Sequence, residues 1–167
     1  MIRLYVKALG LQWGSNTPTL ILMDEEEEKL LPMSIGQAEA QAIMIALQGK
    51  EPPRPLTHDL LKSVIGHMEG EVKRIIIVDL LEQVYHANVV LECKGEEVTV
   101  DSRPSDGIAL ALRTDAPIFI TEDVAERAMV GAELEIKEID GQASFEIDKQ
   151  RFSDFIENVK PSDFKDQ

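Results

Sequence analysis

The chain has 167 residues, of which 44% are hydrophobic and 29% charged, a balance typical of a globular protein that can bury a sizeable core. No apolar run approaches the roughly 18 residues that a membrane-spanning helix needs, and a single cysteine, Cys93, excludes an intramolecular disulfide. The net charge of −14 argues against a broad nucleic-acid-binding track, which requires a basic surface. We therefore expect a cytoplasmic protein with no membrane partner, although a local basic pocket around Arg54 or Arg103 stays compatible with this charge.

The first third of the chain predicts a β-meander. Apolar and polar residues alternate from Ile2 to Lys7, as in a strand with one buried face. The apolar run Leu20–Met23 is separated from Leu30 and Leu31 by five acidic residues. Neighbouring carboxylates repel one another and stay hydrated, so residues 24–28 are expected to form a solvated turn between two strands.

Two helices are predicted next. Ser34 and Gln37 match a capping box, so we expect Ser34 to open the first helix and Gly49 to end it. The prolines of residues 52–55 exclude a helix there. Thr57 is then expected to cap a second helix. Its apolar residues are expected to face the core: Leu60, Leu61, Val64 and Ile65.

Most later elements are strands that follow one another along the chain. Strands are expected over 72–81, 84–91, 98–100 and 117–120, and helices over 105–113, 122–129 and 152–159. The turn dipeptide Asp140-Gly141, flanked by alternating apolar residues, predicts a hairpin. Because the strands cluster and do not alternate regularly with helices, the sequence favours an α+β fold.

A proline-stiffened loop delivers four polar residues to the start of the second predicted helix: Arg54, Thr57, His58 and Asp59. The free N–H groups and the positive dipole end of a helix start favour anions, and an arginine adds a planar donor fork for phosphate. An imidazole can gain or lose a proton near neutral pH, so His58 is the candidate general base or acid. The alternative is structural: Thr57 only caps the helix, Asp59 only complements the helix dipole, and His58 is simply solvated.

A second loop repeats this arrangement, with Arg103 followed by proline and then by Ser105 and Asp106 at a helix start. Asp101 at the preceding strand end and Asp106 could hold a divalent cation, Mg²⁺ or Mn²⁺, which would polarise a phosphodiester and generate hydroxide. Here the alternative is helix capping with a salt bridge from Asp101 to Arg103 or from Asp106 to Arg54. If the two loops converge, they would present two arginines and two helix termini to one ligand.

Three stretches of the sequence resemble the bifunctional nuclease family. They are Leu31–Ala40, Pro53–Asp59 and Asp101–Ala111, and they occur in that family's order. The resemblance implies an α+β fold with a largely antiparallel or mixed sheet, a homo-oligomer (most simply a dimer), and nuclease action on RNA and DNA. It covers about residues 1–130, which leaves 131–167 as a C-terminal hairpin and helix extension. Glu39 and Arg113 also match polar motif positions, whereas Gly107 stands where the family usually has alanine.

Three hypotheses follow for these loops. In the first, the protein is a phosphodiesterase acting on single-stranded or flexible nucleic acid. Arg54, Arg103, Thr57 and Ser105 would bind phosphate, His58 would transfer protons, and the three aspartates would bind metal or orient water. In the second, the same loops bind a small anionic ligand or a protein partner without catalysis. In the third, both arginines are structural ion-pair partners.

Overall fold

The computed structural model describes residues 1–12, 17–50, 52–131, 134–139 and 142–147. The strands are β1 (Ile2–Gln12), β2 (Pro18–Asp24), β3 (Lys29–Ser34), β4 (Gly70–Leu81), β5 (Val84–Cys93), β6 (Glu96–Ser102), β7 (Ile118–Ile120), β8 (Val130–Gly131), β9 (Leu134–Ile139) and β10 (Gln142–Ile147). The helices are α1 (Gln37–Leu47), α2 (Thr57–His67), α3 (Pro104–Thr114) and α4 (Glu122–Ala128). None of the described helices is both long and apolar enough to cross a membrane.

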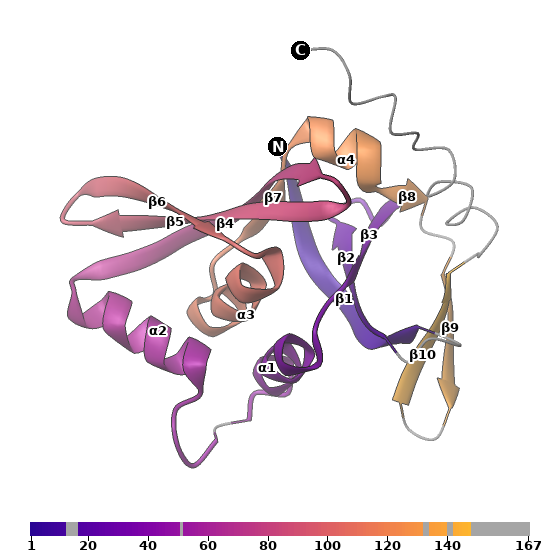
Figure 1. The fold of residues 1–167 in the computed structure, drawn as a ribbon, viewed down its shortest axis with the longest axis horizontal. Coiled ribbons are helices and arrows are strands. Elements are labelled where there is room, and N and C mark those ends of the chain that lie inside the picture. Colours follow the sequence, from indigo (N-terminus) through magenta and orange to yellow (C-terminus); the bar gives the residue numbers. More distant parts are fainter. Residues whose placement is uncertain (13–16, 51, 132–133, 140–141, 148–167) are drawn as a thin grey trace.

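The strands form one mixed sheet in the order β6-β5-β4-β7-β1-β2-β3-β8, and β10 pairs with both β1 and β9 (Figure 1). Most neighbours are antiparallel, but β7 runs parallel to β4, and β10 runs parallel to β1. A parallel pair needs a crossover connection, and α3 lies in the connection that returns the chain from β6 to β7. The predicted α+β class with a mixed sheet is thus confirmed.

The N-terminal meander is confirmed, because β1, β2 and β3 are antiparallel neighbours. The acidic run forms the turn between β2 and β3, as expected. Asp24 is the organising residue of this turn: its side chain is buried, and Oδ1 accepts the backbone N–H groups of Glu28 and Lys29 at 2.9 and 3.0 Å. The other acids of the run are exposed, which lets water screen their mutual repulsion.

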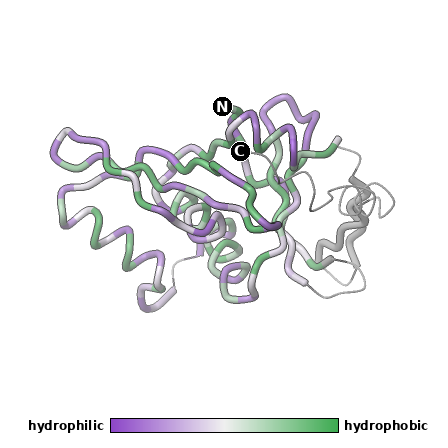
Figure 2. Tube along the Cα trace, turned by 45° about the horizontal axis from the view of Figure 1, so that its top comes forward, coloured by the Kyte–Doolittle hydropathy of each residue, from purple (hydrophilic) through white to green (hydrophobic). Residues whose placement is uncertain are grey.

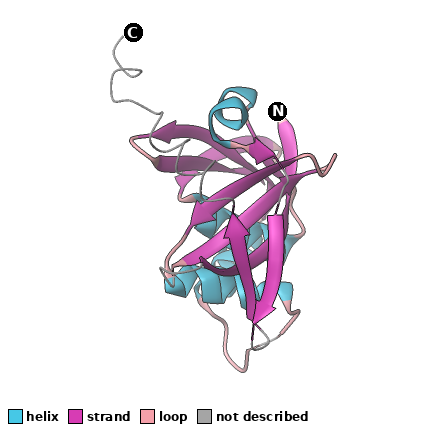
Figure 3. Cartoon of the chain, turned by 90° about the vertical axis from the view of Figure 1, so that its right-hand side faces the viewer, coloured by secondary structure: helices cyan, strands magenta, loops and turns pink. Residues whose placement is uncertain are grey.

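The core lies between the sheet and the helices. It is built from fully buried aliphatic side chains, including Leu20, Leu22, Leu31, Ile43, Ile75, Ile77, Ile108, Leu110, Ile120 and Val124. Helices α1, α2 and α3 lie together, whereas α4 lies apart from them near the N-terminus (Figures 1 and 3). The small residues Ala40 and Ala42 of α1 and Ala109 and Ala111 of α3 are buried. Their size lets the helix backbones approach each other and the sheet closely.

Both predicted capping residues are wrong. Ser34 ends β3, where it pairs with Thr19 of β2, and Gly36 is the N-cap of α1. Sheet pairing at Ser34 therefore overrides its local capping preference. Thr57 is the first residue of α2, and Leu56 is its N-cap. The Leu56 N–H is instead satisfied by the side chain of Asp59, whose Oδ2 accepts it at 2.8 Å.

The predicted core face of α2 is also wrong. Leu60, Leu61 and Val64 are 59%, 43% and 45% exposed, and only Ile65 is partly buried against the core. Helical periodicity identified an apolar face but could not say what covers it. The hydropathy tube shows these apolar positions alternating with polar ones along a helix at one end of the molecule (Figure 2).

The remaining elements differ from the predictions by a few residues at their ends. The hairpin is confirmed, because β9 and β10 pair antiparallel from Leu134↔Ile147 to Ile139↔Gln142. Its predicted turn dipeptide and the helix predicted over 152–159 lie outside the described residues. The division at residue 130 stays a prediction.

Gly107 lies where α3 crosses β4 closely. A Cβ added there would lie 2.9 Å from Cγ2 of Ile75, whereas one added to Gly66 in α2 would have no atom within 4 Å. Alanine improves helix propensity by about 1 kcal/mol at either position, but at Gly107 it also overpacks the core. We expect Gly66→Ala to raise the free energy of unfolding in urea and Gly107→Ala to lower it by about 1 kcal/mol. A gain at both positions would show that Ile75 moves aside at no cost.

Candidate functional site

A groove with a volume of about 540 Å³ opens between one side of α1 and the first turns of α2 and α3. Its lining residues come from α1, from the proline loop that leads into α2, and from the start of α3: Ala38, Glu39, Gln41, Ala42, Ile45, Pro55, Leu56, Thr57, His58, Arg103 and Asp106. Helix N-termini carry unpaired N–H groups and partial positive charge. The two predicted loops therefore converge on one groove within a single chain.

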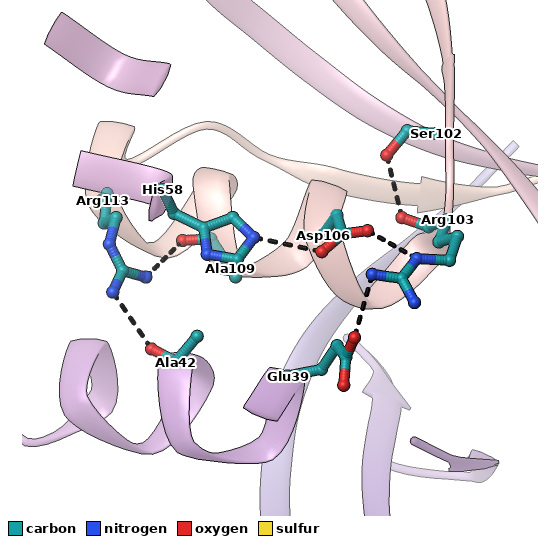
Figure 4. A network of polar contacts seen from close by, with 8 residues as sticks. All are labelled: Glu39, Ala42, His58, Ser102, Arg103, Asp106, Ala109 and Arg113. Carbon is teal, nitrogen blue, oxygen red and sulfur yellow. Dashed lines mark hydrogen bonds and ion pairs between the residues drawn. The ribbon is translucent and has the colours of Figure 1, made fainter. Parts of the chain in front are cut away.

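His58 and Asp106 form the centre of this groove (Figure 4). His58 Nε2 lies 3.2 Å from Asp106 Oδ1, and the imidazole side chain is only 10% exposed. An ionised carboxylate can only accept a hydrogen bond, so this contact places a proton on Nε2. An imidazole that carries its single proton on Nε2 keeps its lone pair on Nδ1, and that nitrogen can accept a proton.

Arg103 joins the two sides of the groove. Its Nε donates to Asp106 Oδ2 at 2.7 Å, and its second amino group lies 2.9 Å from Glu39 Oε1 of α1 (Figure 4). The guanidinium side chain is 67% exposed, whereas Glu39 is 17% exposed. The carboxylate of Glu39 also lies directly against Gly36, because a Cβ on Gly36 would be 2.1 Å from Oε2. Arg103 is thus paired with two carboxylates but remains accessible from solvent.

Asp59 and Arg113 form a second ion pair, beneath the groove. Arg113 Nε donates to Asp59 Oδ1 at 2.6 Å, and its amino groups donate to the carbonyls of Ala109 and Ala42 at 2.7 and 3.2 Å. The Arg113 side chain is 7% exposed, and it links α1, α2 and α3. Burial acts to raise the pKa of Asp59, but the Leu56 N–H and the Arg113 guanidinium outweigh it and lower that pKa. We assign this pair a structural role.

The lowered pKa of Asp59 predicts a specific acid sensitivity. A carboxyl with a lower pKa in the folded state stabilises the protein above its unfolded-state pKa, near the ordinary value of 3.8, and loses this contribution as the pH falls through the folded-state value. We expect Asp59→Asn to lower the melting temperature at pH 6 and to differ less from the wild type as the pH falls below about 4. Thermal unfolding between pH 7 and pH 3 measures this. A difference that does not change with pH would assign the loss to packing alone.

Three other residues predicted for the site, Arg54, Ser105 and Asp101, do not line the groove. Arg54 is exposed beside the groove-lining Pro55, and among the described residues it makes no ion pair. Ser105 is buried in α3 and does not line the groove. Asp101 is exposed on β6, opposite Asn88 in the strand register, and also lies outside the groove. Neither salt bridge weighed for the second loop forms, since Asp106 pairs with His58 and Arg103.

The proposed metal ligands do not gather into a coordination set. Within the described ranges, no three histidine, cysteine or acidic side chains are grouped so that they could hold a metal ion. Both carboxylate oxygens of Asp106 already have partners, His58 and Arg103. The residues present therefore do not fit a cation bound by Asp101 and Asp106, and we derive no catalytic step through one.

The groove includes two polar residues of α1, Glu39, which the resemblance indicated, and Gln41, which the sequence analysis did not single out. Both line the groove, and Glu39 is the partner of Arg103. A usable signal was present: each of α1, α2 and α3 carries an acid at its third position, namely Glu39, Asp59 and Asp106. Acids there complement the helix dipole, so they mark helix starts but do not reveal which starts meet. Nothing in the sequence distinguishes Gln41 from an ordinary exposed helix residue.

Comparison with known proteins identifies the family. The profile of the bifunctional nuclease domain matches residues 20–133, which include every residue of the groove. The chain belongs to the bifunctional nuclease domain family. The expected resemblance is thus confirmed, and the matched range begins within β2 and contains β3 through β8 with helices α1 to α4.

Some relatives in the bifunctional nuclease family match this chain along nearly their whole length, and others match it over only a third of their length. An uncharacterized protein of Mycobacterium tuberculosis is 37% identical over 160 residues, which is 96% of each chain. Bifunctional nuclease 2 of rice (Oryza sativa subsp. japonica) is 31% identical over 112 residues, and bifunctional nuclease 2 of Arabidopsis thaliana is 24% identical over 116 residues. These matches cover 65% and 68% of this chain but only 34% and 35% of the plant proteins. The chain therefore corresponds to about a third of the length of these two plant proteins.

Proposed function

We propose that the groove hydrolyses phosphodiester bonds of RNA and DNA, with single-stranded or flexible nucleic acid as substrate. The observation that carries this proposal is the His58–Asp106 pair beside the accessible guanidinium of Arg103. A base, a residue that orients it and a cation for the phosphate are the minimum that such a hydrolysis needs from side chains. Family membership supports the same activity, since the plant relatives are named bifunctional nucleases.

His58 acts as the general base in this proposal. Asp106 holds the Nε2 proton, and Nδ1 takes a proton from the attacking water as its oxygen forms a bond to phosphorus. The ester phosphorus–oxygen bond then breaks, the leaving oxygen takes a proton from solvent water, and the imidazolium returns its extra proton to solvent. Because water and not a ribose hydroxyl is the nucleophile, the same step serves RNA and DNA. Asp106 also stabilises the imidazolium that forms, so its loss should impair the step nearly as much as loss of His58.

Positive charge in the groove comes from three sources. Arg54 is exposed in the loop next to the groove-lining Pro55, and within the described chain its guanidinium makes no ion pair. Arg103 can turn a donor toward phosphate because its side chain is 67% exposed. The first turns of α2 and α3 add N–H groups and dipole charge. Together these groups favour a phosphate at this groove in an otherwise acidic protein.

The acidic surface favours a flexible substrate over a rigid duplex. With a net charge of −14 the protein offers no extended basic track along which a duplex backbone could lie. A single strand can bend so that one phosphate enters the groove while its neighbours stay away from acidic side chains. The proposal therefore includes weak, salt-sensitive binding.

The direct test uses end-labelled single-stranded RNA and DNA of matched sequence, with duplexes of the same strands. Purified protein is expected to cleave both single strands and to act more slowly on the duplexes. Cleavage must follow the protein peak through size-exclusion and ion-exchange columns. No cleavage of any substrate, or cleavage that separates from the protein, would overturn the proposal.

A second candidate function is binding without catalysis, of a small anionic ligand or of a partner protein. The pairing of Arg103 with both Glu39 and Asp106 favours it, because two carboxylates offset one guanidinium in the unliganded groove. Its signature is a ligand-dependent rise in melting temperature with no turnover. Inorganic phosphate, nucleoside monophosphates and oligonucleotides are suitable probes.

Glu39 competes with the substrate phosphate for Arg103. We expect Glu39→Gln to lower KM for single-stranded RNA several-fold, because the substitution keeps the side-chain size and removes the competing charge. The turnover number should change less, since Glu39 does not contact His58 in this structure. Steady-state kinetics at two salt concentrations measures both quantities. A higher KM in this variant would mean that Glu39 positions Arg103 productively.

A cation, a dimer and a cytoplasmic location complete the proposal. A divalent cation, Mg²⁺ or Mn²⁺, would have to bind together with the substrate, because the described side chains do not form a site for it by themselves. Chelation with EDTA and titration of each metal test this requirement. Asp101→Asn is the informative variant: loss of metal-dependent cleavage would bring Asp101 into the site in spite of its position on β6.

A further inference from the structure

The groove has an apolar part that the proposed cleavage does not use. Binding of the phosphate and proton transfer are assigned to charged side chains, above all His58, Arg103 and Asp106. The volume of about 540 Å³ lies within the range of small-molecule pockets, roughly 300–1,000 Å³. Five of the eleven lining residues are apolar: Ala38, Ala42, Ile45, Pro55 and Leu56. The groove therefore has room and surface for an apolar group beside the phosphate.

The apolar wall of α1 extends the groove away from Arg103. Figure 4 shows Glu39 of α1 next to Arg103, and Ala42 nearly one turn farther along the helix. Ile45 follows after almost another turn, roughly 9 Å from Glu39 along the helix axis at 1.5 Å per residue. A ligand that is anionic at one end and apolar at the other fits this arrangement.

The proline loop supplies a second apolar wall. Pro55 and Leu56 line the groove directly before the first turn of α2, which carries His58. Leu56 is held in place, because its N–H donates to Asp59 Oδ2 at 2.8 Å. The flat face of a nucleobase outside a duplex packs against apolar side chains of this kind. A nucleobase joined through one sugar to a phosphate at Arg103 therefore matches both ends of the groove.

Gln41 lines the groove but takes no part in its polar contacts. It is exposed, and within the part of the chain that the structure describes its amide has no hydrogen-bond partner. Successive residues turn about 100° around a helix axis, so Gln41 and Glu39 lie on opposite flanks of the face of α1 that carries Ala42. Glu39 pairs with Arg103 on its own flank. The amide of Gln41 is thus available to a ligand that lies along this face.

We propose that the groove holds one nucleobase beside the bound phosphate and that Gln41 selects adenine there. The inference rests on the proposed nuclease function, because the phosphate at Arg103 fixes where the base lies. An amide presents a donor and an acceptor side by side, and these match N7 and the N6 amino group of adenine. A single strand exposes this edge without being taken out of a duplex. Gln41 is therefore a specificity-determining residue and takes no part in bond breaking.

Equilibrium binding tests the base subsite without any cleavage. Isothermal titration calorimetry compares adenosine monophosphate, cytidine monophosphate and ribose 5-phosphate, none of which contains a phosphodiester bond. The wild type is expected to bind the adenosine nucleotide about tenfold more tightly than the cytidine nucleotide. Ribose 5-phosphate lacks the base and should bind more weakly than either. Equal affinity for adenosine monophosphate and ribose 5-phosphate, or no binding of the nucleotide at millimolar concentration, would overturn the proposal.

Substitutions of Gln41 test its assignment in the same assay. Gln41→Ala is expected to remove the preference for adenosine monophosphate and to leave the affinity for ribose 5-phosphate unchanged, because the amide contacts only the base. Gln41→Glu should favour the cytidine nucleotide, since a carboxylate accepts from the cytosine amino group and cannot donate to N7 of adenine. The matched control is Gln37→Ala in the first turn of the same helix, which does not line the groove and should keep the wild-type preference. An adenine preference that survives Gln41→Ala would overturn the role of Gln41.

Cleavage maps separate this proposal from the nuclease proposal. On single strands of random sequence, the wild type is expected to cut with adenine enriched on one side of the cleaved bond, and Gln41→Ala to cut without that enrichment. Cutting by the wild type with no base preference would overturn the base subsite and leave the nuclease function standing. No cutting at all, together with an adenine preference in binding that Gln41→Ala removes, would overturn the nuclease function and leave the nucleotide subsite standing.

Discussion

His58→Ala is expected to reduce cleavage of both RNA and DNA by about 10² to 10⁴-fold, the range of a lost general base. The substitution removes the imidazole held by Asp106 at 3.2 Å and leaves the rest of the groove in place. KM should change little, because phosphate binding is assigned to arginines and helix termini. Asp106→Asn should reduce the turnover number too, since an amide can no longer fix the imidazole as a carboxylate does. Single-turnover cleavage with excess enzyme measures the chemical step directly.

The control for His58 is a second histidine on the same helix. His67→Ala removes an exposed imidazole at the end of α2 that is hydrogen-bonded to the carbonyl of Ser63 and does not line the groove, and cleavage should stay within two-fold of the wild type by the same assay. His58 is buried, so the melting temperature of His58→Ala has to be measured alongside. Unchanged cleavage by a folded His58→Ala protein would remove the base from the mechanism.

Arg113→Ala is expected to lower the free energy of unfolding by about 3 kcal/mol, the lower end of the range for breaking a buried ion pair. It leaves Asp59 with a charge but without its guanidinium partner, and it removes donors from the carbonyls of Ala109 and Ala42. Arg113→Lys should recover only part of this loss, because an ammonium group cannot reach three acceptors in the same plane. Urea denaturation followed by circular dichroism measures both variants.

An arginine in a more exposed ion pair is the matched control for Arg113. Arg74 makes two hydrogen bonds to Glu97 at 2.7 and 2.9 Å, but its side chain is 30% exposed and that of Glu97 54%. Water and salt screen such a pair, so Arg74→Ala should cost far less stability than Arg113→Ala. Similar losses for the two variants would mean that burial does not distinguish these ion pairs.

The sequence by itself determined local structure wherever no contact with a distant part of the chain opposed the local preference of the residues. The alternation from Ile2 to Lys7, the acidic turn after Asp24 and the proline loop before α2 all form as predicted. The predicted helix caps at Ser34 and Thr57 were wrong. Ser34 pairs within the sheet, and the side chain of Asp59 accepts the backbone N–H at the start of α2. The helix ends moved by a few residues because several neighbouring residues satisfy a terminus nearly equally well.

In the candidate site, too, the sequence predicted which residues are polar, and the packing decided which of them meet. Sequence alone named His58, Arg103 and Asp106 as polar residues at helix starts, because prolines and acids mark those positions. Their meeting in one groove depends on the crossover that places α3 beside α1 and α2, a contact between residues nearly fifty positions apart. The same packing placed Asp59 and Arg113 under the groove, left Asp101 outside it, and left the apolar flank of α2 uncovered. A residue's chemistry is local, but its neighbours and its exposure are decided only when the layers pack.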